Sequence, residues 1–358
     1  MSTPSKPATG SQSEASRSGH YRVAIVGATS LRGKEVAEVL SDRNFPAIDV
    51  KLLDDDESLG QLESVGDEMS FIQGVNAEQF DQIDFAFFTS TAEFTRSIWK
   101  RVRDAGSSIV DLSYGLEDEP GALVRAPWIE RQLAQSRPLE LQPGPSVVAH
   151  PASVVLALLL LRAQQAAKLS RVTATIFEPV SERGQKGMDE LHEQTVNLLS
   201  FQPLPKNIFD TQVAFNMVSR YGEQSTPPLA STERRVLKHY QTIVGKNHIA
   251  PSLLLVQAPI FHGHAFAIHL ELEQAADISV LSKAFSGEHV NIIASSEEAP
   301  SNVNAAGQGD ILLSILPDAN HPNSVWLWAA SDNLRIAATT AVECAETMAA
   351  SRPRGKIQ

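Results

Sequence analysis

The chain has 358 residues, 42% of them hydrophobic, which is enough for two globular domains with cores of their own. Its formal net charge of -12 excludes binding of nucleic acid or an anionic membrane through bulk electrostatics. A single cysteine, Cys344, excludes a disulfide framework and a cysteine-rich zinc site, and it makes a cytoplasmic location the expectation.

The chain opens with a segment that is unlike the rest in composition. Residues 1–20 are rich in Ser, Thr, Pro and Lys and have no apolar core, so they predict a disordered tail and not a signal peptide. The longest apolar run, Val154 to Leu161, is too short to span a bilayer. We therefore expect no membrane segment.

Residues 21–40 predict a strand, a tight turn and a helix. The apolar run Val23–Val26 is typical of a buried strand, and Lys34–Leu40 has helical periodicity. Such a unit directs backbone N–H groups and a helix N-terminus at an anion, usually a cofactor pyrophosphate. The spacing Gly-x-x-x-x-x-Gly also suits a plain strand-to-helix connection, which remains the alternative. The candidate cofactor-binding residues of this turn are Gly27, Thr29, Ser30, Leu31 and Gly33.

A second predicted strand, Val50–Leu53, ends in the acidic cluster Asp54–Glu57. A carboxylate about 20 residues beyond the glycine turn can bind the adenosine ribose hydroxyls, so Asp54 is a candidate for that role. Four acids also repel a 2′-phosphate, which favours NAD over NADP as the cofactor. The alternative is a solvated acidic turn without a ligand.

Alternating elements follow. Asp84–Ser90 and Ser108–Leu112 predict strands on either side of a helix over Phe94–Ala105, which indicates a doubly wound parallel sheet. The stretch from Val147 to Leu161 predicts a strand, a break at Pro151 and an apolar helix.

Beyond residue 170 longer strands predict a second, α+β domain with a largely antiparallel sheet. The final strand and helix are expected to return to the first domain. The predicted strands are Arg171–Val180, Ser252–Ile260, Ala265–Glu273 and Val325–Ala330, and the predicted helices are Gly187–Leu199 and Asn333–Ala349.

Eight short segments, in order, resemble motifs of the aspartate-semialdehyde dehydrogenase family. They are Tyr21–Gly33, Asn44–Pro46, Asp111–Ser113, Ala149–Pro151, Glu190–Thr195, Ala214–Asn216, Pro259 with Gly263-His264, and Leu327-Trp328 with Asp332–Arg335.

The resemblance implies an α/β fold made of an N-terminal NAD(P)-binding Rossmann domain and an α+β semialdehyde-dehydrogenase dimerisation domain. The first domain would span residues 21–150, completed by the returning helix at 331–350, and the second would span residues 151–330. A homodimer is implied as well, and Asn333 falls at a cofactor-binding position.

The chemistry of that family requires a cysteine thiolate, a histidine acid and base, and arginines that hold phosphate and the substrate carboxylate. Placed on this chain without a gap, the nucleophile position is Ser153; shifted by one residue, it would be Ala152. The acid–base position is His264, and three substrate-binding positions are Glu117, Glu178 and Gln257. A serine hydroxyl is not a thiolate, and Glu117 inverts the charge at the phosphate position. Gln257 removes a guanidinium fork.

These replacements predict a member that is inactive on aspartate semialdehyde, a dimeric scaffold or regulatory protein that is able to retain dinucleotide binding. One alternative is an active NAD(P)-dependent oxidoreductase on another aldehyde or oxo substrate, using His264. A further alternative is a hydrolytic pair of Ser153 with His264, although no orienting third group is visible. The small-molecule substrate stays unknown.

Other reactive side chains have plainer interpretations. His262 and His264, two apart on a probable strand, would share a face with His269 opposite, but no third ligand can be placed, so no metal site is predicted. Arg235 and its neighbour Arg234 are candidates for anion contact or for a solvated helix face. Cys344 is expected to be a packed thiol.

Overall fold

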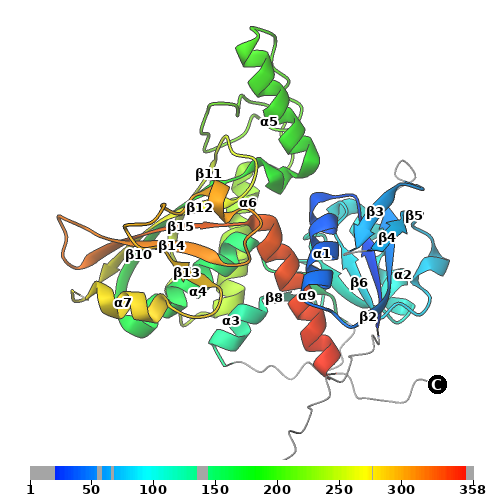
Figure 1. Ribbon diagram of the computed structural model, residues 1–358, viewed down its shortest axis with the longest axis horizontal. Helices are drawn as coiled ribbons and strands as arrows, with labels where there is room; N and C mark the ends of the chain where they lie inside the picture. Colours follow the sequence, from blue (N-terminus) through cyan, green and yellow to red (C-terminus); the bar gives the residue numbers. More distant parts are fainter. Residues whose placement is uncertain (1–20, 55–58, 66–67, 135–143, 276, 352–358) are drawn as a thin grey trace, which may run out of the picture.

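The computed structural model describes residues 21–54, 59–65, 68–134, 144–275 and 277–351. Two large sheets lie side by side, and the long C-terminal helix runs between them (Figure 1). The predicted N-terminal tail and three of the four acids in the Asp54–Glu57 cluster lie outside the described residues. Within the described ranges, no helix is long and apolar enough to cross a membrane.

The first sheet has seven strands in the order β5-β2-β1-β6-β7-β9-β8. Every neighbouring pair is parallel, which confirms the predicted parallel sheet. The strands are β1 (Tyr21–Val26), β2 (Ala47–Asp54), β5 (Gln73–Gly74), β6 (Phe85–Phe88), β7 (Ser108–Asp111), β8 (Leu123–Arg125) and β9 (Ser146–Val148).

Helices cover both faces of this sheet, as the unbroken apolar run of β1 requires. On one face, α1 (Leu31–Asp42) and α9 (Asn333–Ser351) share a core with Ile25 of β1. On the other, α2 (Ala92–Asp104) packs Trp99 against Ala24 of the same strand. The returning helix α9 therefore completes the core of the N-terminal sheet.

The second sheet has six strands in the order β11-β10-β12-β15-β14-β13. Its three central pairings are antiparallel, but the outermost pair at each edge is parallel, so the largely antiparallel sheet expected from the sequence is in fact mixed. Parallel neighbours need a crossover, which helix α6 (Leu229–Val244) supplies between β10 and β11. The strands are β10 (Leu169–Glu178), β11 (Ser252–Gln257), β12 (His264–Leu272), β13 (Val290–Ile292), β14 (Ile311–Pro317) and β15 (Ser324–Ser331).

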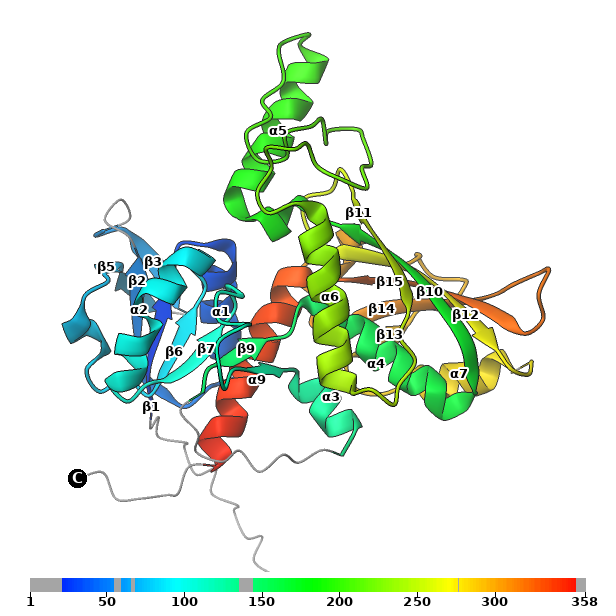
Figure 2. The ribbon, with the colours of Figure 1, turned by 180° about the vertical axis from the view of Figure 1, so that it is seen from behind.

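Helices α4 (Pro151–Ala166), α6 (Leu229–Val244) and α7 (Ile278–Phe285) pack together on one face of this sheet (Figure 2). Helix α5 (Gly184–Leu199) projects away from both sheets, at the top of Figures 1 and 2. The short elements are β3 (Leu62–Val65), β4 (Glu68–Phe71), η2 (Ala77–Phe80), α3 (Pro127–Gln132), η3 (Val180–Arg183) and α8 (Asn302–Ala305).

The opposite face of the six-stranded sheet carries half-exposed apolar side chains. Leu254 is in register with Thr175, which is in register with Ala267, and Ala267 with Trp328. One row further, Leu316 pairs with Trp326. Leu254, Leu316 and Trp326 are 49%, 48% and 41% exposed, whereas Leu255, pointing to the helices, is buried. These half-exposed side chains make up an apolar face of the second sheet, opposite the helices.

Candidate functional site

The glycine turn between β1 and α1 is sterically tight. Gly27 has φ of 89°, and a Cβ at this residue would lie 2.5 Å from the backbone nitrogen of Ser90. A Cβ at Gly33 would lie 2.3 Å from the carbonyl oxygen of Gly27. Both positions therefore require glycine, and the turn brings the start of α1 close under the first strand.

Polar contacts hold the same turn from both sides. Ser30 is the N-cap of α1: its Oγ accepts from Gly33 N–H and donates to the carbonyl of Thr89, both at 3.0 Å. The carboxylate of Asp54 accepts from the N–H and the hydroxyl of Thr29, each at 2.7 Å. The structure thus places Thr29, Ser30 and Asp54 together, with Leu31 as the first residue of α1.

Arg32, one residue further, links the two domains. One guanidinium nitrogen donates to the carbonyl of Leu112 at 2.8 Å, and the other contacts the Glu182 carboxylate, also at 2.8 Å. Asn333, at the start of α9, donates to the other oxygen of Glu182 at 2.8 Å and accepts from Gly263 N–H at 3.1 Å. The amide of Asn333 is fully buried in these contacts, and its predicted role at the cofactor stays a prediction.

Glu178 and His264 form a buried pair at adjacent strand ends. The Nε2 atom of His264 lies 3.0 Å from Oε2 of Glu178, and both side chains are almost completely buried. Burial raises the pKa of Glu178. The other ring nitrogen of His264, Nδ1, is buried without a hydrogen-bond partner among the described residues. An unpartnered buried imidazole nitrogen is a free acceptor or donor for a ligand.

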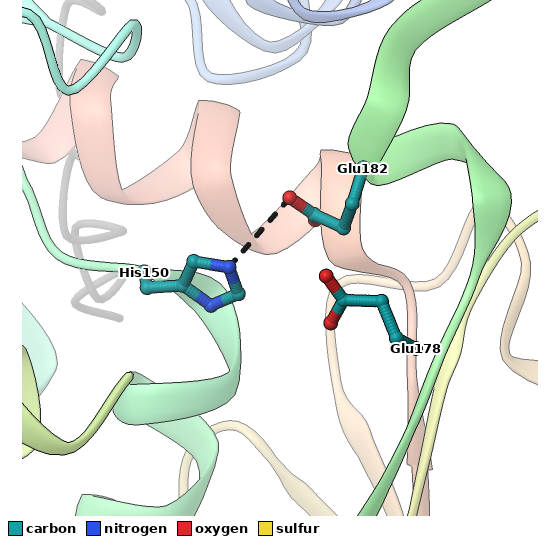
Figure 3. A group of neighbouring side chains, drawn as sticks. All are labelled: His150, Glu178 and Glu182. Carbon is teal, nitrogen blue, oxygen red and sulfur yellow. Dashed lines mark ion pairs between the residues drawn. The ribbon is translucent and has the colours of Figure 1, made fainter. Parts of the chain in front are cut away.

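His150, the N-cap of α4, converges with the two glutamates, as Figure 3 shows. Ligand atoms of His150, Glu178 and Glu182 all lie within 4.8 Å of one another. Burial lowers the pKa of His150 well below its ordinary range, so the ring is neutral at pH 7. Burial opposes ionisation of Glu182 too and is the largest single influence, but Arg32, the neighbouring imidazoles and the hydrogen bond from Asn333 together outweigh it and lower the pKa of Glu182 to about 2.

A second charged group lies on the other side of His150, around Glu117. Its carboxylate accepts from Arg235 through two nitrogens, at 2.8 and 3.0 Å, and lies 3.2 Å from Nε2 of His239. Burial disfavours the charge, but these hydrogen bonds lower the pKa of Glu117 to about 2. The Tyr114 ring lies between the two groups, with the guanidiniums of Arg32 and Arg235 at 4.9 and 4.7 Å from its centroid.

Two of the predicted site positions, Ser153 and Gln257, use their side chains in hydrogen bonds that hold the fold together. Ser153 is fully buried and its hydroxyl donates to the carbonyl of Val236 at 2.8 Å, so no hydrogen bond joins it to His264. Gln257 is also fully buried: it accepts from the Tyr221 hydroxyl at 2.6 Å and donates to the carbonyls of Glu178 and Ala258. Among the predicted catalytic and substrate positions, only Glu178 and His264 are joined side chain to side chain, whereas Gln257 reaches the backbone carbonyl of Glu178.

Three of the remaining sequence interpretations can be compared with the structure. The prediction that His262 and His264 share a strand face is wrong, because Gly263, at φ of 81°, breaks the extended backbone and β12 begins at His264. Arg235 is paired, whereas Arg234 is exposed. Cys344 is buried within α9, and burial raises the pKa of its thiol to about 12.

Sequence reasoning missed several members of this site. His150 lies in the Ala149–Pro151 motif and Arg32 inside the glycine turn, but neither was assigned chemistry, and Glu182 lies just beyond the predicted strand Arg171–Val180. The sequence signal that could have found them is the presence of titratable side chains within or next to the motif segments. What the sequence could not supply is that α4, η3 and α1, far apart in the chain, meet at one point.

Comparisons with known proteins cover nearly the whole chain. Residues 22–136 match the family described as "Semialdehyde dehydrogenase, NAD binding domain", and residues 159–336 match "Semialdehyde dehydrogenase, dimerisation domain". A "USG-1 protein homolog" of Pseudomonas aeruginosa is 31% identical over 87% of this chain and 93% of its own length.

An enzyme and a solved structure also resemble this chain, at a sequence identity slightly lower than that of the USG-1 homolog. "Aspartate-semialdehyde dehydrogenase" of Rickettsia conorii is 28% identical over 92% of this chain and 97% of its own. The solved structure of "a probable aspartate-semialdehyde dehydrogenase from Pseudomonas aeruginosa" superposes with a TM-score of 0.81 at 28% identity. That match covers 92% of this chain and 98% of the other.

Proposed function

The chain belongs to the aspartate-semialdehyde dehydrogenase family, as a USG-1-like member, and we propose that it does not catalyse the phosphorylating oxidation of aspartate semialdehyde. Its role is that of a dimeric scaffold or regulatory member that retains a dinucleotide-binding domain. The observation that carries this proposal is the charge balance of the site. Both guanidiniums that reach it, those of Arg32 and Arg235, are already paired with carboxylates of the same chain, Glu182 and Glu117.

An anionic substrate and phosphate would have to displace those carboxylates. Breaking a buried charge pair by removing one partner costs about 2–5 kcal/mol, and the displaced glutamate would then repel the incoming anion. The covalent step lacks a nucleophile as well. The sole cysteine, Cys344, is buried with its pKa raised, and the Ser153 hydroxyl is directed at the carbonyl of Val236.

The proposal is tested with the full-length protein, aspartate semialdehyde, phosphate and either NAD or NADP, following absorbance of the reduced cofactor. We expect no turnover above that of the His264→Gln variant purified in the same way. Any rate shared by both preparations comes from a contaminating enzyme. Turnover at a rate typical of an active family member, abolished by His264→Gln, would overturn the proposal.

Dinucleotide binding is supported by the glycine turn and by the match of residues 22–136 to a NAD-binding family. We propose that NAD binds in preference to NADP, because the carboxylate of Asp54 lies 2.7 Å from Thr29 in the turn and repels a 2′-phosphate. Titration calorimetry with each cofactor measures the preference. Asp54→Asn should reduce the ratio of the two affinities, and tighter binding of NADP than NAD to the unaltered protein would contradict the assignment.

A second candidate function is an NAD-dependent oxidoreductase acting on an uncharged aldehyde or ketone. The buried Glu178–His264 pair favours it, since an imidazole backed by a carboxylate is a suitable proton donor and acceptor. Reduced NAD would then be consumed with one member of a panel of neutral carbonyl compounds, and His264→Gln would abolish that rate. Binding of NAD without any such reaction favours the first proposal.

A further inference from the structure

We propose that His150, Glu178 and Glu182 form a binding site for a divalent transition-metal ion such as Zn²⁺ or Mn²⁺. An imidazole and two carboxylates are a common ligand set for these ions, whereas Mg²⁺ and Ca²⁺ prefer oxygen ligands alone. The inference goes beyond the proposed function, and its failure would leave that proposal unaffected.

Geometry is the first argument. The three side chains come from the N-cap of α4, the last residue of β10 and the helical turn η3, and they point toward one another in Figure 3. Their ligand atoms lie within 4.8 Å of one another. Atoms bound at about 2.0–2.2 Å from one ion lie no more than about 4.4 Å apart, so adjustments of a few tenths of an ångström complete the site.

Charge is the second argument. The side chains of Glu178 and Glu182 are only 2% and 5% exposed, so neither carboxylate is stabilised by bulk water. Arg32 compensates one negative charge through its contact with Glu182 at 2.8 Å. Within the part of the chain that the structure describes, the Glu178 carboxylate has only the His264 imidazole as a hydrogen-bond partner. A divalent cation would supply the missing positive charge.

His264 is the third argument, because it contacts one of the three ligand side chains, Glu178. Its Nε2 lies 3.0 Å from an oxygen of Glu178, the arrangement in which an imidazole orients a carboxylate ligand. Its Nδ1 is buried and unpartnered, and its ring centroid is 5.8 Å from that of His150. A polar atom buried without a partner suggests that a ligand completes the environment.

One hydrogen bond of His150 must be broken before the ion can bind. Nδ1 of His150 accepts a long hydrogen bond, 3.3 Å, from Ala152 N–H, which leaves the ring proton on Nε2 facing Glu182. Coordination through Nε2 moves this proton to Nδ1 and removes the hydrogen bond. The guanidinium of Arg32 also repels a cation beside Glu182, so removing Arg32 should strengthen binding.

The experiment uses the full-length protein, stripped with a chelator and titrated with Zn²⁺, Mn²⁺ or Co²⁺, with bound metal counted by mass spectrometry. We expect one ion per chain and a Co²⁺ absorption spectrum typical of nitrogen and oxygen ligands. Glu178→Gln and His150→Gln should each weaken binding at least about 10-fold. His289→Gln, which removes a partly buried imidazole outside the cluster, is the matched control and should bind as the unaltered protein does.

Arg32→Gln distinguishes loss of a ligand from misfolding, because it should strengthen metal binding whereas the ligand variants should weaken it. We expect it to bind the ion at least several-fold more tightly and to gain more in melting temperature on adding Zn²⁺ than the unaltered protein gains. The proposal is overturned if no saturable binding occurs, if binding persists in both ligand variants, or if Arg32→Gln weakens it.

Discussion

At the scale of single residues, acidic side chains of the site are paired with other residues of the same chain. Glu117 stands at the phosphate position, where the family resemblance implies an arginine, and Glu178 stands at a substrate-binding position. Neither is left as an isolated charge: Glu117 contacts Arg235 and His239, and Glu178 contacts His264. A carboxylate introduced alone into such a site would be strongly destabilising. These residues therefore make sense only as a set of paired groups.

The Glu117 pair gives a stability prediction with a control next to it in the chain. Glu117→Gln should destabilise the protein by about 1–3 kcal/mol, because Arg235 and His239 lose a charged acceptor in a site that is mostly buried. Asp118→Asn, which removes the exposed pair with Lys238, should change stability by less than about 0.5 kcal/mol. Urea unfolding of the three proteins measures both values. Equal effects would show that the Glu117 contacts are not stabilising.

His289 predicts a pH dependence of stability. Burial, aided by the charge of Arg131, lowers its pKa to about 4, and its ring stacks on Trp128 with centroids 3.8 Å apart. Between pH 6.5 and 4 the unfolded chain takes up a proton on this residue and the folded protein does not, so stability falls as the pH is lowered. Above pH 6.5 the ring is neutral in both states and contributes no pH dependence.

Melting temperatures at pH 7 and pH 5 check this sign. His289→Gln removes the titrating group, so its melting temperature should drop less between the two pH values than that of the unaltered protein. His192→Gln, on the exposed side of α5, is the control and should keep the full drop. An equal drop in all three proteins would contradict the role of His289.

At the scale of elements, the glycine turn should be the position least tolerant of an added methyl group. Gly33→Ala places a Cβ 2.3 Å from the carbonyl oxygen of Gly27, whereas a Cβ at Gly309 meets nothing within 4 Å. We expect Gly33→Ala to cost about 1–3 kcal/mol or more, and Gly309→Ala to be close to neutral. Urea unfolding again provides the measurement. Similar midpoints for the two variants would mean that the turn relaxes easily.

The main elements could be predicted from the sequence because their apolar periodicity is strong. β1, α2, β7, α4 and α9 lie where the periodicity places them, within a few residues. The short strands β8 and β13, three residues each, carry too little pattern to be recognised. Helix α6 was indicated only by the helix face considered for Arg234 and Arg235, although its buried residues are helically spaced. The crossover that makes the β10–β11 pair parallel was therefore missed.

The candidate site was predictable only in part. The family resemblance identified Glu178 and His264, which the fold brings together, but it assigned Ser153 a role that its hydrogen bond to Val236 does not support. His150 and Arg32 were missed, because their significance depends on side-chain direction and on contacts between domains. Neither quantity leaves a periodic signal in the sequence.

At the scale of the whole molecule, the apolar face of the second sheet predicts a homodimer. Residues 159–336 match a dimerisation-domain family, and the helices α4, α6 and α7 cover only the opposite face. Trp326→Asp should convert the dimer to monomers by placing a charge in the interface. Sedimentation velocity measures the outcome. Val280→Asp, a similarly exposed apolar position on α7, is the control and should remain dimeric.

If the unaltered chain is a dimer and the Trp326→Asp variant is a dimer too, the interface lies elsewhere. The projecting helix α5 and the loop after it would then be the next region to test, since Leu199, Phe201 and Phe215 are exposed there.

Arg32 lies in the glycine turn proposed to bind a dinucleotide, and its guanidinium contacts a carboxylate of the neighbouring domain. Any ligand of the turn that attracts this guanidinium withdraws the counter-charge of Glu182, and anything bound at Glu182 alters the attraction available to that ligand. Thermodynamic reciprocity then requires that each occupant change the dissociation constant of the other by the same factor. Through this one side chain, binding at the glycine turn and binding at Glu182 would be coupled.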